Sequence, residues 1–206
     1  MLKKTKIAVL VSGGGTNLQA LIAAQAAGKL VSGEIALVVS NKADAFALTR
    51  AERAGIPTAV VLRADFTDND GFEAALLDIL KAAGIELIIL AGFMRILSRA
   101  FISHYPQRIL NVHPSLIPAF CGEGFYGLRV HEAALRYGVK VTGATVHYVN
   151  EIPDGGEIIL QKAVAVAADD TPQTLQRRVM EEAEWQLLPQ AAELVAAKIR
   201  KDEQNI

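Results

Sequence analysis

The sequence predicts an α/β fold: a doubly wound, mostly parallel sheet with an antiparallel strand toward its C-terminal side. Short apolar runs rich in β-branched residues, of which Ile7–Val11 is the first, indicate strands buried on both faces. These runs alternate with stretches of helical periodicity through short connections, which is typical of parallel sheets covered by helices. A glycine-rich turn at residues 12–17 joins the first strand to the first helix.

Composition limits the class of protein. The chain has 206 residues, 51% of them hydrophobic, and no linker-like stretch divides it. A net charge of −1 argues against a nucleic-acid surface, and the single cysteine, Cys121, excludes an internal disulfide and a multi-cysteine zinc site. No apolar run is long enough for a transmembrane helix or a signal peptide. We therefore expect a cytoplasmic protein without nucleic-acid or membrane partners.

The first strand leads into Ser12-Gly13-Gly14-Gly15-Thr16-Asn17, a glycine turn at a helix N-terminus. Backbone N–H groups converge on anions at such turns, and Thr16 or Asn17 can cap the helix or donate to a phosphate. A tight strand-to-helix turn explains the same residues equally well. A dinucleotide site is disfavoured, because Leu18 stands where glycine or alanine is required and the second strand ends in Ser40-Asn41 rather than an acid.

The alternation continues through the N-terminal half. Further strands are expected at residues 35–40, 57–62 and 86–90, separated by helices at 44–54 and 70–83. Residues 91–97 follow with apolar side chains where a loop would ordinarily be polar. They either pack under the next helix or form an apolar wall for a flat ligand.

The next strand ends in a distinctive pair of polar residues. Asn111 and His113 lie two positions apart, so in an extended strand their side chains project to the same face. Pro114 stops the strand and places both groups at its carboxyl end, where open α/β sheets bind ligands. For an isolated Asn-x-His, a strand that frays into a turn is the alternative.

The C-terminal half begins with residues 119–127, whose three glycines and three aromatics predict a mobile lid or an irregular surface loop. A helix at 128–137 should end at Gly138, and strands follow at 141–149 and 158–166, the second antiparallel at the end of the sheet. His147, in the first of these strands, is expected to be packed or hydrogen-bonded. Asp154, which precedes Gly155-Gly156 in the connecting turn, can be explained by ordinary turn chemistry.

Residues 171–198 predict a long helix that Pro189 interrupts. Its glutamates, Glu181, Glu182 and Glu184, suit a solvated face, although one could turn inward toward a cationic group.

These features together suit acyl transfer between two bound substrates. Such a reaction needs donors at a developing oxyanion and a group that moves a proton between the attacking and leaving nitrogens. Asn111 offers an N–H donor to the oxyanion, and His113 can either stabilise the oxyanion or move the proton. A carboxylate near His113 would raise the pKa of that histidine. The chain has no nucleophilic serine or cysteine with a base motif and no H-E-x-x-H pair, so we expect no metal.

Asn111-Val112-His113-Pro114-Ser115-Leu116-Ile117-Pro118 resembles the signature of the folate-dependent formyltransferases. Residues 12–19, 40–45, 91–97 and 146–156 resemble further blocks of those members that formylate glycinamide ribonucleotide in purine synthesis. The resemblance implies a single domain with the Rossmann-like formyltransferase fold over residues 1–206. Its N-terminal half (about 1–105) would bind phosphate, and its C-terminal half (about 106–206) would hold the catalytic and folate-binding residues.

The resemblance also implies the chemistry. The formyl group of 10-formyltetrahydrofolate, a co-substrate, would pass directly to the amine of glycinamide ribonucleotide. Asn111 and His113 would be catalytic, and Asp154 would be the carboxylate that keeps His113 cationic.

Binding residues follow from the same resemblance. Glu184, ahead of Pro189, best matches the glutamate that contacts the glycinamide, and Glu181 and Glu182 match it less well. The ribosyl phosphate would bind Gly15, Thr16 and Asn17, and the pterin would be surrounded by Met94, Arg95, Ile96, Leu97, Asn150, Glu151, Ile152, Pro153 and Asp154.

The chain departs from the family pattern at three places. The 119–127 loop is longer than is common, Arg129 stands where a histidine is frequent, and Asn69 falls where a basic residue often meets the folate. These departures concern contacts with the folate tail.

Other functions are compatible with parts of this pattern. A 10-formyltetrahydrofolate hydrolase shares the Asn-x-His-Pro core but carries an additional N-terminal domain, for which a first strand near residue 6 leaves no room. A non-catalytic phosphate-binding module would not need Asn111, His113 and Asp154 together. For the transferase we expect a monomer or a weak homodimer.

Overall fold

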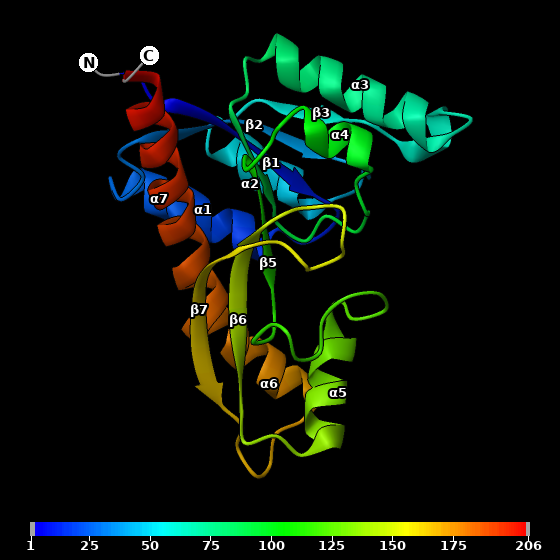
Figure 1. The fold of residues 1–206 in the computed structure, drawn as a ribbon, viewed down its shortest axis with the longest axis vertical. Helices are drawn as coiled ribbons and strands as arrows, with labels where there is room; N and C mark the ends of the chain where they lie inside the picture. The colour runs from blue at the N-terminus through cyan, green and yellow to red at the C-terminus, as the bar shows by residue number, and fades with distance from the viewer. Residues whose placement is uncertain (1–2, 205–206) are drawn as a thin grey trace.

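The computed structural model describes residues 3–204, which form one sheet of seven strands in the order β3-β2-β1-β4-β5-β6-β7 (Figure 1). Strands β1 to β5 run parallel, whereas β6 runs antiparallel to both β5 and β7. The predicted fold class is confirmed. The strands are β1 (Thr5–Val11), β2 (Gly33–Ser40), β3 (Thr58–Val60), β4 (Leu87–Leu90), β5 (Ile109–His113), β6 (Val141–Tyr148) and β7 (Ile158–Ala165).

Helices cover both faces of the parallel part of the sheet and flank its antiparallel part (Figure 1). They are α1 (Thr16–Ala26), α2 (Phe46–Arg53), α3 (Asn69–Ala82), α4 (Arg99–Ser103), α5 (Leu128–Tyr137), α6 (Pro172–Val179) and α7 (Trp185–Gln204), with a 3₁₀ turn η1 (Arg63–Asp65) and a π-turn η2 (Met180–Glu184). No helix within residues 3–204 is long and apolar enough to cross a membrane.

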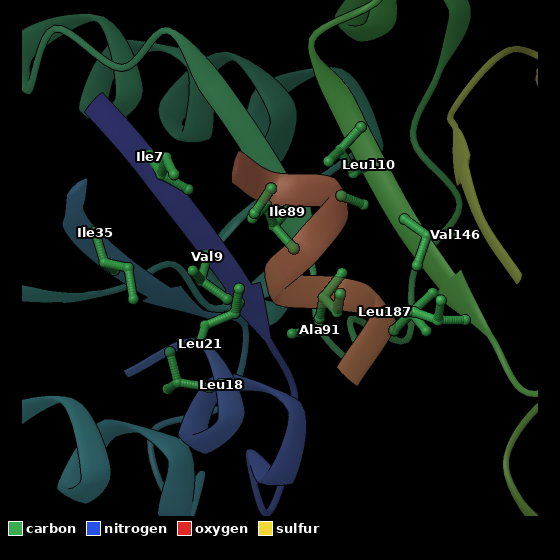
Figure 2. Packing of buried hydrophobic residues seen from close by; sticks show 14 of the residues in the cluster. Ile7, Val9, Leu18, Leu21, Ile35, Ile89, Ala91, Leu110, Val146 and Leu187 are labelled. Carbon is green, nitrogen blue, oxygen red and sulfur yellow. The ribbon is translucent and has the colours of Figure 1, made fainter. Parts of the chain in front are cut away.

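Strand β1 shows why the apolar runs form central strands. Ile7, Val9 and Val11 belong to a core on one face of the sheet, and Ala8 and Leu10 to a core on the other, with all five fully buried. The first core packs against α1 and α7, as Figure 2 shows for residues of β1, β4 and both helices. The second core packs against α3 and α4. Alternate side chains of β1 therefore face different cores, and all of them must be apolar. This explains why the β1 sequence is continuously rather than alternately hydrophobic.

Some boundaries differ from those expected. β3 pairs only over Thr58–Val60 rather than 57–62, because it is the edge strand and contacts β2 alone. The short helix α4 and the turn η1 have no counterpart in the expectations, since three to five residues are too few for a periodic pattern.

The C-terminal helical stretch does not break at Pro189, which lies inside α7. Its break is the π-turn η2, which begins nine residues before the proline. Pro189 has no N–H to donate to the carbonyl of residue 185, and its ring crowds that carbonyl. The π-turn ends at Glu184, one residue before that carbonyl.

Candidate active site

Strand β5 ends in two polar side chains at the carboxyl end of the parallel sheet. The register of the antiparallel pair sets His147 of β6 opposite Asn111, and Thr145 opposite His113. His113 is only 4% exposed, and Asn111 is half-buried. Polar groups buried to this extent need hydrogen-bond partners from the protein or from a ligand.

Asp154 reaches back from the β6–β7 connection onto this strand end. Its Oδ2 atom lies 3.3 Å from Nδ1 of His113 and accepts a hydrogen bond from the Gly122 N–H at 2.9 Å. Its Oδ1 atom accepts a hydrogen bond from Nδ2 of Asn111 at 3.3 Å. The three residues expected to be catalytic are therefore neighbours in one cluster.

The connection that carries Asp154 is tightly built. Asp154 itself has a φ of +54°, a conformation that favours glycine. A Cβ atom on Gly156 would come within 1.7 Å of the Tyr148 carbonyl oxygen, so only glycine fits there. Within the turn, the Asn150 side chain accepts a hydrogen bond from the Ile152 N–H at 3.0 Å. These contacts hold the carboxylate at a fixed place relative to β6.

Burial governs the charge of His113 and Asp154. Burial raises the pKa of Asp154, but hydrogen bonding to His147, the charge of His113 and the Gly122 N–H lower that pKa by more, so Asp154 is a carboxylate at neutral pH. Burial lowers the pKa of His113, and Asp154 opposes this shift without reversing it. Asp154 thus favours the charged form of His113, as expected, but loss of solvation outweighs this attraction in the structure, and the role of Asp154 in keeping His113 cationic stays a prediction.

His147 is a fourth member of the cluster. Its Nδ1 atom donates a hydrogen bond to the Tyr148 carbonyl oxygen at 2.8 Å, because a carbonyl oxygen can only accept. Its Nε2 atom lies 3.3 Å from Nδ2 of Asn111 and 3.5 Å from Asp154 Oδ1. His147 therefore lies against both the Asn111 amide and the Asp154 carboxylate. Sequence reasoning placed His147 among packed or hydrogen-bonded residues; the antiparallel register with β5 is the signal that links it to the site.

The 119–127 segment lies against the His113 ring. The Phe120 carbonyl accepts a hydrogen bond from Nε2 of His113 at 2.8 Å, while the Gly122 N–H binds Asp154. Phe120 has a φ of +50°, which is uncommon for a residue with a side chain. Nε2 of His113 can reach a substrate only when the Phe120 carbonyl moves away.

A cavity of about 700 Å³ runs from this cluster to α1 and η2. Three apolar side chains along it, Met94, Ile96 and Ile152, are more than half exposed, which suits a flat apolar ligand. Glu151 does not line the cavity and instead lies 3.3 Å from Arg99 at the surface. The other residues expected around the pterin do line it, namely Met94, Arg95, Ile96, Leu97, Asn150, Ile152, Pro153 and Asp154.

The glycine turn before α1 lies at the far end of the cavity. Gly15 is the N-cap with a φ of +72°, and a Cβ atom there would come within 2.6 Å of the Ala47 Cβ. No side chain caps α1, so of the two roles considered for Thr16 and Asn17 the structure excludes the helix cap; both residues are already helical. Asn17 lines the cavity, whereas Gly15 and Thr16 do not. The N–H groups of the first turn are thus available to an anion.

Glu184 is the glutamate of η2 that turns inward. It is 6% exposed, and its Oε2 atom accepts a hydrogen bond from Nδ2 of Asn17 at 2.7 Å. Burial raises the pKa of Glu184 to about 7, with the Asn17 hydrogen bond opposing the shift. Glu181 and Glu182 are exposed, and Glu181 pairs with Arg177 at 2.7 Å. Glu184 alone of the three meets the cavity.

Asn69 and Arg129, which depart from the family pattern, both contact side chains within the protein. Asn69 accepts a hydrogen bond from Nη2 of Arg95 at 3.2 Å, and the Arg95 guanidinium lies 5.4 Å from the centre of the Phe72 ring. Arg129 lies 4.8 Å over the Tyr126 ring. Asn69 therefore positions Arg95 beside the cavity. Within residues 3–204 no group of three or more His, Cys, Asp or Glu side chains is arranged to hold a metal ion.

Comparison with known proteins gives consistent matches. A family model described as formyl transferase matches residues 5–192. Phosphoribosylglycinamide formyltransferase of Haemophilus influenzae is 44% identical over 184 residues, which cover 89% of this chain and 84% of that protein. The crystal structure of glycinamide ribonucleotide transformylase 1 from Symbiobacterium toebii has a TM-score of 0.89 at 43% identity and covers 95% of this chain and 89% of that chain.

A larger protein contains a similar segment. The trifunctional purine biosynthetic protein adenosine-3 of Gallus gallus is 49% identical over 195 residues, which cover 94% of this chain. The chain spans only 19% of the length of that protein.

Proposed function

The chain belongs to the formyl transferase family, and we propose that it transfers the formyl group of 10-formyltetrahydrofolate to the amine of N1-(5-phospho-D-ribosyl)glycinamide. The products are N2-formyl-N1-(5-phospho-D-ribosyl)glycinamide and tetrahydrofolate, in de novo purine biosynthesis. The Haemophilus influenzae and Symbiobacterium toebii relatives, named for this activity, support the assignment through their similarity over most of the chain.

The two substrates would approach the cluster from opposite ends of the cavity. The pterin suits the apolar wall of Met94, Ile96 and Ile152, which otherwise exposes apolar surface to water. The ribosyl phosphate suits the uncapped N-terminus of α1 at Gly15–Asn17, where N–H groups and the helix dipole favour an anion. The amine of the acceptor would then lie between Glu184 and His113.

The proposed reaction is a direct transfer. The amine nitrogen attacks the formyl carbon and forms a C–N bond, while the carbonyl oxygen becomes an oxyanion. The bond between that carbon and N10 of the folate then breaks, and the proton lost by the attacking amine moves to N10. Asp154 and His147 are placed to hold this proton or to order a water that carries it.

The oxyanion would take the place of the Phe120 carbonyl next to Nε2 of His113. A carbonyl offers only partial negative charge to that N–H, whereas an oxyanion offers a full one. The developing charge therefore favours the imidazolium form, whose second N–H faces Asp154. The interaction is stronger in the transition state than with either ground-state substrate, which is the condition for catalysis.

The observation that carries this proposal is the contact of Asp154 with both His113 and Asn111, at 3.3 Å each, inside a cavity that reaches Asn17 in the first turn of α1. A direct test incubates the protein with 10-formyltetrahydrofolate, with and without glycinamide ribonucleotide, and follows tetrahydrofolate release. Release that depends on the acceptor is expected. Release without the acceptor would indicate a hydrolase, and no release in either case would indicate a binding module.

A further inference from the structure

A second buried histidine lies beside the proposed active site without a hydrogen bond to the protein. His131 of α5 is fully buried, and among residues 3–204 neither of its ring nitrogens has a partner. The other buried residues of α5, Val130 and Ala134, are apolar, as expected for a helix that only packs. Buried polar atoms are nearly always hydrogen-bonded, so two unpaired nitrogens in one ring point to a partner that the chain does not supply.

The position of His131 indicates where that partner would come from. His131 belongs to the wall of the cavity that also contains His113 and Glu184. Its helix α5 packs beside α6, and α6 leads through η2 to Glu184 (Figure 1). Through α6, His131 is connected to the part of the cavity that carries Glu184, which we assign to the acceptor.

The charge of His131 limits the chemistry of the partner. Burial, together with the nearby charge of His113, lowers the pKa of His131 to about 4, so the ring is neutral at physiological pH. A neutral imidazole has one N–H donor and one lone pair. Both ring nitrogens are satisfied by an uncharged group that accepts and donates at once, as a sugar hydroxyl does. A phosphate would leave the lone pair unpaired, and an ammonium would leave the N–H unpaired.

We infer that His131 binds a ribosyl hydroxyl of the acceptor, donating from one ring nitrogen and accepting at the other. The inference rests on the proposed function and adds to it a residue that determines substrate specificity. Residues 122–127 line the same cavity and lead directly into α5 at Gly127. A shift of the 119–127 segment that withdraws the Phe120 carbonyl from His113 would therefore also open the way to His131.

The principal test measures steady-state kinetics for both substrates with His131→Leu. We expect the KM for glycinamide ribonucleotide to rise at least about tenfold, because the variant loses both the donated and the accepted hydrogen bond, while the KM for 10-formyltetrahydrofolate stays within about twofold. The melting temperature should be equal or higher, because the variant removes two unpaired polar atoms from the interior. His104→Leu, at an exposed histidine after α4, is the matched control and should leave both KM values unchanged.

A second measurement uses acceptors that each lack one ribose hydroxyl. For one of them the wild-type KM should rise by about tenfold, and His131→Leu should show no further rise with that acceptor, since the interaction is already absent. His131→Asn, which keeps a donor and an acceptor, should recover part of the loss. Wild-type-like acceptor KM in His131→Leu, or additive losses for every hydroxyl, would overturn the inference. Failure of the wild-type protein to formylate glycinamide ribonucleotide would instead overturn the proposed function.

Discussion

Two charge clusters lie at opposite ends of the parallel strands, and they are built differently. At the amino end, Arg200 of α7 lies 2.5 Å from Glu86 and 2.9 Å from Glu203, and it donates to Thr5 at 2.9 Å. Glu86 also accepts from the Lys6 N–H at 3.0 Å. In this half-buried cluster each of these donors faces an acceptor, and the Arg200 cation lies between the two carboxylates.

In the cluster at the carboxyl end, fewer of the hydrogen-bonding groups have a suitable partner. The neutral ring of His113 has one N–H, yet its two nitrogens face a carbonyl and a carboxylate. His131, beside it, has no partner among the described residues. A complete set of partners stabilises a fold, whereas an incomplete set leaves groups for a substrate to engage. The amino-terminal cluster should therefore govern stability, and the carboxyl-terminal cluster should govern turnover.

The largest expected effect is the loss of turnover when His113 is substituted. His113→Ala should lower kcat by roughly 100-fold or more, because it removes the group nearest the developing oxyanion. The free energy of unfolding, measured in urea, should change little, since the variant also removes a ring with an unmatched nitrogen. Turnover close to that of the wild type would end the division of roles between the two clusters.

The next effect concerns the coupling between Asp154 and His113. Asp154→Asn should lower kcat by about 10-fold to 100-fold and should lower the pKa of His113 further, because the carboxylate is the main influence that raises it. Histidine titration by NMR measures the shift directly. A His113 titration that is unchanged in the variant would contradict the coupling.

The amino-terminal cluster is tested through Arg200. Arg200→Met should reduce the free energy of unfolding by about 1–3 kcal/mol, because Glu86 loses its main partner while it remains mostly buried, and kcat should not change. Arg99→Met breaks the exposed pair with Glu151 and serves as the control, with an expected loss near zero. A fall in kcat for Arg200→Met without a loss of stability would contradict the assignment of stability to the amino-terminal cluster.

The same cluster predicts the response to acid. Burial raises the pKa of Glu86, but the Lys6 N–H and the Arg200 side chain help to lower it by more, so the pKa lies below its ordinary value of 4.5. The stability that this carboxylate contributes is complete above pH 4.5 and is lost as pH falls through the lowered pKa. Urea denaturation between pH 3 and pH 6 should show a smaller acid-induced loss in Glu86→Gln than in the wild type.

Glu184 sharpens the comparison, because it is a buried carboxyl with one amide partner. Its pKa of about 7 means that ionisation opposes folding, with no cost below pH 4.5 and the full cost above pH 7. Glu184→Gln should therefore raise the free energy of unfolding by up to about 3 kcal/mol at pH 8.5 and leave it unchanged at pH 4. Equal gains at both pH values would show that ionisation is not the cause.

Local sequence signals predict the parallel half of the fold well. Both faces of β1 are buried, as its continuous apolar run predicts. Helix α5 ends at Gly138, whose φ of +83° is one that glycine readily adopts. The same signals cannot place Asp154 against His113. That contact depends on how β6 pairs with β5 and on the closure of the turn at Gly156, so it was expected only from the family resemblance.

Other features of the site depend on the packed chain and have no local signal. The neutral state of His113 follows from burial, which a strand-end sequence does not reveal. The contact of the Phe120 carbonyl with that ring requires a positive φ at a phenylalanine, which no turn rule predicts. The inward orientation of Glu184 follows from the π-turn, where periodicity alone would predict a regular helix.

That π-turn also changes how the C-terminal helix depends on its residue count. A π-turn closes its hydrogen bond over five residues and an α-turn over four, so the π-turn holds one residue more for about the same rotation of the chain. Loss of a single codon within Met180–Glu184 would therefore be absorbed by closing the π-turn to an α-turn, which leaves Leu187 and Ala191 at their buried sites. Loss of two codons would exceed this reserve and rotate α7 relative to α6 by about 100°.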